Sequence, residues 1–101
     1  MIQRVVTVKL TDAFANDATR AKIAEETPAV LRKAHGVLDV RVGVPSDGRT
    51  RREWDLCILV QFASQADVDV YRDDPIHRAY ADDFLEPMQK TIRVWNFELP
   101  D

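Results

Sequence analysis

Two segments of the chain alternate apolar and polar side chains with the period of two that a β-strand requires. In Ile2–Leu10, four of the five even-numbered residues are apolar. In Trp54–Phe62 every even-numbered residue is apolar, and the intervening Cys57 and Leu59 are apolar as well. A strand with apolar side chains on both sides is typical of a sheet that is covered on both faces. We therefore expect both faces of the strand 54–62 to be covered.

A helix is predicted after the first strand. Asn16 or Asp17 can be its N-cap, because a short side-chain oxygen accepts hydrogen bonds from the free N–H groups of a first turn. Pro28 removes a backbone donor and clashes with the preceding turn, so we expect a kink or a break after Glu26. Gly36 is expected to end the helix. The residues spaced as one face of this helix are Ile23, Thr27, Val30, Leu31 and Ala34.

A second helical region follows Phe62 and extends to about residue 90. Ser64 can cap its first helix, with Asp67 three residues later as a partner for the helix dipole. The sequence 73–75, Asp-Asp-Pro, should interrupt this helix, because proline disfavours helix in the residue before it and suits the first turn of a new helix. The second helix is expected to begin near Ile76, and Pro87 to start a further turn.

Two more strands complete the pattern, at 37–43 and 91–99, and a polar tip is expected between 45 and the third strand. The order β-α-β-β-α-β predicts an α+β, ferredoxin-like fold. In it, a four-stranded antiparallel sheet has its first and third strands in the centre and both helices on one face. A chain of 101 residues is long enough for one core, so we expect a single domain over 1–101.

Charge and composition limit the classes of partner. The net charge of −3 provides no field that would attract nucleic acid or an anionic membrane. No apolar run approaches the length of a bilayer span, and the first residues lead directly into a strand. The single cysteine, Cys57, excludes an internal disulfide. We expect a cytoplasmic protein that binds neither nucleic acid nor membrane.

The sheet face away from the helices is too apolar to remain in water. Its odd-numbered residues are Val5, Cys57, Leu59, Trp95, Phe97 and Leu99. The alternative is the ordinary apolar surface of a small protein, but two large aromatic residues on one terminal strand argue against it. A symmetric homodimer that packs sheet on sheet would bury Leu59, Trp95 and Phe97.

Five segments together resemble the stress-responsive dimeric alpha/beta-barrel (Dabb) family. They are MIQRVVTVKL, GVLDVRVG, WDLCILVQFAS, VYRDDPIHRAY and IRVWNFEL, and they span nearly the whole chain. The resemblance implies a ferredoxin-like homodimer whose two sheets close into a barrel, with a small-molecule cleft between sheet and helices in each subunit. Most members have no established reaction. The similar plant polyketide cyclases use a tyrosine and a histidine for an intramolecular aldol condensation.

The resemblance implies roles for particular residues. The histidine of the proline-x-histidine motif matches His77, and the cyclase tyrosine matches Tyr71. This chain has Arg4 where family members usually have a histidine, and Asn96 where they usually have an aspartate. An amide can orient an imidazole but supplies no charge, and a nearby arginine disfavours the imidazolium. A histidine base is therefore expected to be weaker here than in the cyclases.

The alternation of the strands supports a pocket with these residues. Arg4, Ile58 and Asn96 all lie on the even-numbered face, where Tyr71 and His77 would close over them. Because the first and fourth strands are neighbours in this topology, Arg4 is expected close to Asn96. An arginine on an otherwise apolar face needs an anionic or carbonyl partner. The expected ligand is a small, largely apolar molecule with an acidic or enolisable oxygen. The alternatives are a solvated His77, a Tyr71 that belongs only to the core, and an Arg4 that extends to solvent at the strand end.

Other candidate sites are weaker. Arg49, Arg51 and Arg52 form a basic tip that is expected to be solvated. Asp73 and His77 alone do not make a metal site, and the chain has neither a phosphate-binding glycine loop nor a zinc-binding cysteine set. We therefore expect no metal and no cofactor.

Three functions remain open at this stage. One is a cyclase-like lyase or isomerase, in which His77 removes a proton next to a carbonyl and Tyr71 donates a hydrogen bond to the resulting oxyanion. The second is a non-catalytic, stress-associated dimeric binding protein. The third is cofactor-free oxygenation, which occurs in the wider barrel superfamily. The first function needs Tyr71 and His77 to converge on a cavity, and the second does not.

Overall fold

The computed structural model describes all 101 residues and contains one antiparallel sheet of four strands in the order β2-β3-β1-β4. The strands are β1 (Ile2–Leu10), β2 (Asp39–Gly43), β3 (Leu56–Phe62) and β4 (Gln89–Glu98). The first and third strands are central, as the sequence predicts. The ferredoxin-like arrangement is thereby confirmed, although β2 and β3 each begin two residues later than expected.

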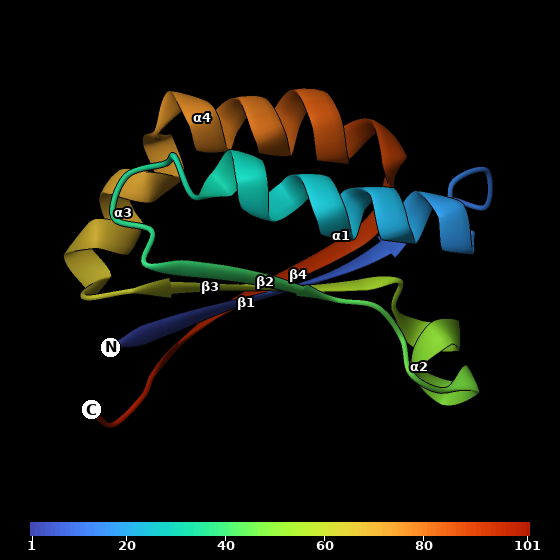
Figure 1. Cartoon of the computed structure of the whole chain (residues 1–101), viewed down its shortest axis with the longest axis horizontal. Helices are drawn as coiled ribbons and strands as arrows, with labels where there is room; N and C mark the ends of the chain where they lie inside the picture. The colour runs from blue at the N-terminus through green and yellow to red at the C-terminus, as the bar shows by residue number, and fades with distance from the viewer.

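The helices cover one face of this sheet (Figure 1). They are α1 (Asp17–Leu31), α3 (Gln65–Asp73) and α4 (Pro75–Arg78), which continues into the π-helical segment η1 (Ala79–Leu85) and the 3₁₀ turn η2 (Glu86–Met88). One further short helix, α2 (Gly48–Glu53), lies away from this layer at one end of the sheet. The space between the sheet and this helical layer is bordered by the even-numbered sheet face and by α1, α3, α4 and η1.

Helix α1 begins where predicted but is not interrupted. The Asn16 side chain accepts a hydrogen bond from the N–H of Thr19 at 2.9 Å, as an N-cap does. Of the predicted kink or break after Glu26, the break is wrong, because α1 continues through Pro28 to Leu31. Its buried residues on both sides of the proline pack against the core, and this packing outweighs one lost backbone hydrogen bond. Gly36, with φ of +72°, ends the turn after the helix rather than the helix itself.

The break at Asp73-Asp74-Pro75 is confirmed. Helix α3 ends at Asp73, and the Asp74 side chain accepts a hydrogen bond from the N–H of Ile76 at 2.8 Å. Pro75 occupies the first turn of α4, where its missing N–H costs nothing. The chain therefore bends between Tyr71 and His77.

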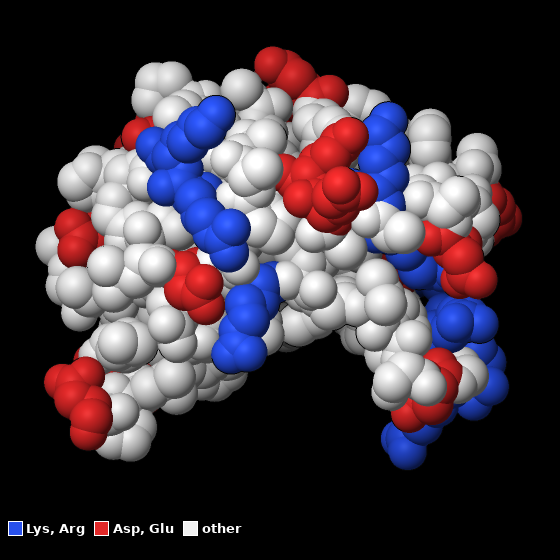
Figure 2. Space-filling model, viewed as in Figure 1, with Lys and Arg blue, Asp and Glu red and all other residues white.

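The predicted polar tip before β3 is a helix. Asp47 accepts a hydrogen bond from the N–H of Thr50 at 2.7 Å and caps α2, which carries Arg49, Arg51 and Arg52. Figure 2 shows α2 and the chain termini projecting on opposite sides of a hollow below the sheet. The basic residues thus lie at the rim of the open sheet face.

The core lies between the even-numbered sheet face and the helices. Its sheet residues include Val8, Leu10, Leu56, Val60 and Phe62, each at most 1% exposed. The opposite face is open, with Trp95 44% and Phe97 54% exposed. The expectation that both faces of β3 are covered is therefore not met within one chain, where Cys57 and Leu59 are only half-buried.

A buried ion pair anchors α1 to the sheet. Asp55 is completely buried and accepts hydrogen bonds from Arg20 Nε and Nη2, at 3.0 and 2.7 Å, and from the N–H of Leu10 at 2.7 Å. Burial alone would raise the pKa of Asp55. The hydrogen bond from Leu10 and the guanidinium of Arg20 outweigh that effect and lower the pKa. This pair was not predicted from the sequence.

None of the helices has the length and apolar character needed to cross a membrane.

Candidate functional site

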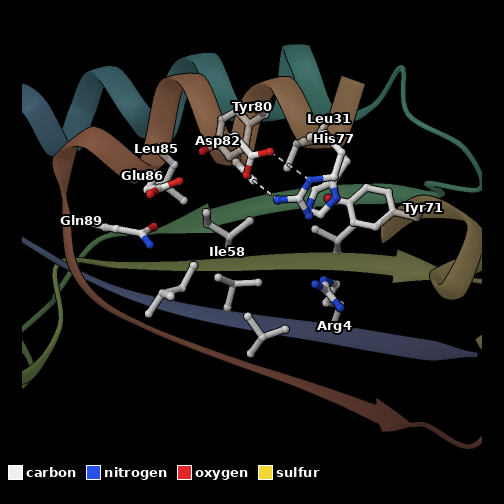
Figure 3. Close-up of a pocket in the computed structure, with 16 residues that line it drawn as sticks. Arg4, Leu31, Ile58, Tyr71, His77, Tyr80, Asp82, Leu85, Glu86 and Gln89 are labelled. Atoms are coloured by element: carbon white, nitrogen blue, oxygen red, sulfur yellow. Dashed lines mark hydrogen bonds and ion pairs between the residues drawn. The ribbon is translucent and has the colours of Figure 1, made fainter. Parts of the chain in front are cut away.

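A cavity of about 310 Å³ lies between the even-numbered sheet face and the helical layer. This volume is within the range of small-molecule sites. Its lining is mostly apolar, and the sheet supplies Val6, Ile58, Val60, Ile92 and Val94. Figure 3 shows Arg4 on the sheet side of one end, facing Tyr71 and His77, with Glu86 and Gln89 at the other end.

Tyr71 and His77 form a stacked pair across the break between α3 and α4. Their ring centroids are 4.2 Å apart and the rings are inclined by 30°. Phe62 packs edge-on against the other side of Tyr71, with centroids 4.8 Å apart. Both residues are largely buried, at 2% and 9% exposure respectively. The bend at Pro75 therefore brings the two side chains together at the cavity wall.

The hydrogen bond of His77 determines its tautomer. Nδ1 lies 3.2 Å from the carbonyl oxygen of Arg72, and because a carbonyl only accepts, Nδ1 carries the hydrogen. Burial lowers the pKa of His77, the bond to Arg72 opposes this, and the charges of Arg4 and Arg78 lower the pKa further. His77 is therefore neutral at pH 7, and Nε2 keeps its lone pair.

Arg4 has no carboxylate partner. It is 8% exposed, and its Nη1 donates a hydrogen bond to Oδ1 of Asn96 at 3.2 Å. No Asp or Glu side chain lies within ion-pair distance of its guanidinium. Burial lowers the pKa of Arg4, yet an arginine stays charged in proteins. The cavity therefore contains a positive charge that the chain itself does not neutralise.

The Tyr71 ring also contacts this charge, with the guanidinium carbon of Arg4 5.7 Å from the ring centroid. Burial raises the pKa of Tyr71 above its usual value, although Arg4 acts in the opposite direction. Tyr71 therefore remains a protonated phenol, which can donate a hydrogen bond to an oxygen in the cavity.

The structure brings four of the five predicted site residues together around this cavity: Arg4, Ile58, Tyr71 and His77. Asn96 does not line it and acts on the site only through its bond to Arg4. The amide lies beside the guanidinium, as the neighbouring strands predict, because Asn96 is paired with Arg4 in the β1–β4 register. It does not orient the imidazole of His77, which is bonded to the carbonyl oxygen of Arg72.

The helical wall of the cavity was not predicted from the sequence. Arg78 lines it but is paired with Asp82, which accepts its Nε hydrogen bond at 3.2 Å. Tyr80 is buried, and its hydroxyl shares a hydrogen bond with the hydroxyl of Thr27 on α1. Burial raises the pKa of Tyr80 to about 12, while the bond to Thr27 opposes the shift. Only the spacing of these residues along the helical region could have indicated them.

No group of three or more His, Cys, Asp or Glu side chains is close enough to hold a metal ion. Within the cavity, Arg78 is paired with Asp82, and Tyr80 is paired with Thr27. The polar groups that remain available to a ligand are Arg4, Tyr71, His77 and the distal Glu86 and Gln89.

A family model described as the stress responsive A/B barrel domain matches residues 2–99. A search of curated protein sequences finds no match.

Solved structures have the same fold at low sequence identity. A protein from Arabidopsis thaliana is 14% identical, with a TM-score of 0.82 over 100% of this chain and 97% of that chain. A Dabb family protein from Mesorhizobium loti, with a ferredoxin-like fold, is 18% identical, with a TM-score of 0.79 over 99% and 97%. The hydroxynitrile lyase of Passiflora edulis is 14% identical, with a TM-score of 0.78 over 99% and 94%.

Further structures of this fold, from Bacteroides fragilis, Thermobifida fusca and a Jannaschia species, are described as dimeric. At these identities the likeness concerns the fold.

Proposed function

Because this chain belongs to the stress-responsive A/B barrel domain family, we propose that it binds a small apolar molecule with an anionic or enolisable oxygen. The observation that carries the proposal is the buried charge of Arg4, which has no carboxylate partner at the end of an apolar cavity. Leaving such a charge unpaired costs free energy that an anionic ligand would recover. The ligand's oxygen is therefore directed to Arg4 and its apolar part to the sheet residues.

We further propose that the bound molecule is a substrate for proton abstraction. Nε2 of His77 would take a proton from the carbon next to a carbonyl, and the C–H electrons would form the carbon–carbon double bond of an enolate. The negative charge that develops on the oxygen would be stabilised by Arg4 and by the phenol of Tyr71. Return of the proton from His77 to another atom of the substrate would complete an isomerisation. In a lyase reaction the enolate would instead expel a group from the adjacent carbon, and His77 would give its proton to that leaving group.

A non-catalytic binding protein is the second candidate. It is favoured by the surroundings of His77, whose ring bonds to a backbone carbonyl and not to a carboxylate, and whose pKa is lowered. A histidine of low basicity is a weaker base for carbon acids.

The hydroxynitrile lyase among the structures of this fold is in keeping with the catalytic proposal.

The proposal includes a homodimer formed through the open sheet face. Leu59, Trp95 and Phe97 lie on that face, and the dimeric proteins of the same fold support such an arrangement.

Ligand binding and proton abstraction can be tested together. A thermal-shift screen of small carboxylates, phenols and 1,3-dicarbonyl compounds would identify ligands. We expect Arg4→Leu to lose most of the stabilisation by anionic ligands. Exchange of the ligand's α-hydrogen for deuterium in D₂O, followed by NMR, would report proton abstraction without knowledge of the product.

His77→Gln provides the control, because it keeps a polar side chain of similar reach but removes the base. It is expected to bind the ligand and to abolish exchange. Binding without any exchange in the wild-type protein would leave the non-catalytic candidate. Equal binding of anionic ligands by wild type and Arg4→Leu would contradict the proposal that Arg4 binds the ligand's anionic oxygen.

A further inference from the structure

A second, smaller cavity lies behind the helical wall of the site. Its volume is about 230 Å³, and its lining consists of Glu26, Val30, Ala79, Tyr80 and Phe84. Most of this lining is apolar, and it comes from α1 and from the segment formed by α4 and η1. Val30 and Ala79 are exposed, so this second cavity is a groove that opens to solvent between α1 and η1.

Tyr80 stands between the two cavities. It is the only residue that lines both. Figure 3 shows Tyr80 on the helical side of the ligand cavity, whereas Arg4 extends from the sheet. A ligand with its oxygen at Arg4 and an apolar tail extending toward the helices would therefore meet the Tyr80 ring.

A hydrogen bond holds that ring in place. The Tyr80 hydroxyl is bonded to the hydroxyl of Thr27, which is fully buried on α1. No other side-chain hydrogen bond and no ion pair joins α1 to η1. Two buried hydroxyl groups that satisfy each other are costly to separate, so the ring stays in its position unless the bond is replaced.

We propose that Tyr80, positioned by Thr27, sets the maximum length of the ligand's apolar part. The proposal rests on the proposed function, because it assumes that Arg4 holds the ligand's oxygen. It identifies the ligand class as a carboxylate or similar anion with a short apolar tail. Removal of the Tyr80 ring would join the two cavities and admit longer tails.

Two series of straight-chain compounds separate the roles of Tyr80 and Arg4. The alkanoates from hexanoate to dodecanoate have both a charge and a tail, and the alkanols of the same lengths have only the tail. In isothermal titration calorimetry, the wild-type affinity for each series should rise with chain length and then level off. In Tyr80→Ala the rise should continue, by about tenfold for every two methylene groups buried.

Three further variants control the interpretation. Tyr80→Phe and Thr27→Val remove only the hydrogen bond, and both should extend the length limit by less than Tyr80→Ala does. They also carry the test if Tyr80→Ala does not fold. Phe84→Ala enlarges only the second cavity, so it should leave the limit unchanged while Tyr80 still separates the cavities.

The outcomes distinguish the two proposals. An unchanged length limit in Tyr80→Ala, Tyr80→Phe and Thr27→Val would overturn the role of Tyr80. The absence of binding of both series to wild type and to Tyr80→Ala would overturn it as well. If Arg4→Leu binds alkanoates as wild type does while Tyr80→Ala still extends the limit, the anionic part of the proposed function fails and the length limit stands.

Discussion

Arg4 determines the chemical character of the candidate site. A guanidinium on an apolar sheet face would normally be paired with a carboxylate, yet here Asn96 is the residue that holds it. An amide oxygen orients the guanidinium without cancelling its charge. The same charge disfavours protonation of His77, whose imidazole is also desolvated. One residue therefore attracts an anion and keeps the neighbouring histidine neutral.

This arrangement predicts the effect of a carboxylate in place of Asn96. In Asn96→Asp the new carboxylate should pair with Arg4 and compete with the ligand's anion. We expect roughly a tenfold loss of affinity for the carboxylates found in the screen, equivalent to about 1.4 kcal/mol. Isothermal titration calorimetry would measure the loss.

The matched control is Asn96→Ala, which removes the hydrogen bond to Arg4 but adds no charge and should therefore have a smaller effect. An NMR titration of His77 would accompany both variants. A raised pKa of His77 in Asn96→Asp with undiminished anion binding would show that position 96 acts on the imidazole instead.

At the scale of single residues, the alternation of the strands was sufficient to predict that Arg4 and Ile58 lie on the side of the sheet that faces the helices. The resemblance to the family indicated Tyr71 and His77 as site residues. The contact between Asn96 and Arg4 was expected from strand neighbourhood. The ion pair of Arg78 with Asp82 has the i,i+4 spacing of neighbours on a helix, which the sequence does contain. The hydrogen bond between Tyr80 and Thr27 depends on how η1 packs against α1, and no local pattern in the sequence indicates it.

The link between α1 and the sheet is the Asp55–Arg20 pair. Asp55 lies just before β3 and also accepts a hydrogen bond from the last residue of β1, so one carboxylate connects three elements. A buried pair of this kind is costly to break, because the remaining partner keeps its charge in a nonpolar environment.

Asp55→Asn should therefore lower the free energy of unfolding by about 3 to 5 kcal/mol in urea denaturation at pH 7. Asp17→Asn is the control, because Asp17 contacts the same arginine at 3.0 Å but is 86% exposed. Its loss should cost less than about 1 kcal/mol. Similar effects for the two variants would contradict the importance assigned to the buried pair.

The pair also gives the stability a defined pH dependence. The pKa of Asp55 is lowered in the folded state, so its contribution is complete above the unfolded value near 3.8. It disappears as the pH falls through the folded pKa. Asp55→Asn should accordingly lose less stability than wild type between neutral pH and the acid range.

At the scale of elements, the sequence was informative wherever a local rule decided the outcome. The Asp-Pro sequence at 74–75 ends one helix and starts the next, because side-chain capping and the missing N–H of proline act within a few residues. Pro28 was misleading, because the long-range packing of α1 decides whether the helix continues. Helix α2 was missed, since its only signal was the cap at Asp47 and it has no apolar face.

The molecule as a whole is covered on one side only. Its helical layer lies over one face of the sheet (Figure 1). The large side chains of Trp95 and Phe97 on β4 remain exposed on the other face. Proteins of this fold that are described as dimeric are consistent with a second copy on the open face. The projecting α2 and termini would then flank the partner (Figure 2).

Trp95→Asp tests this association. Burial of such a side chain is worth roughly 1.5 to 3 kcal/mol, and a symmetric dimer contains it twice, so the dissociation constant should rise at least about a hundredfold. Analytical ultracentrifugation would measure it. Val70→Asp is the control, because Val70 on α3 is 53% exposed and lies away from this face. A wild-type protein that is monomeric at micromolar concentration would exclude the dimer.

The alternation of β4 has a consequence for how the protein can change. Ile92 and Val94 face the ligand cavity, whereas Trp95 and Phe97 face the open side. Substitutions in the row that faces the cavity can therefore alter ligand preference without altering subunit pairing. Substitutions in the row that faces the open side can alter subunit pairing without altering ligand preference. An insertion or deletion of one residue exchanges the two rows. This strand should consequently accept many changes of residue type during evolution but almost no change of length.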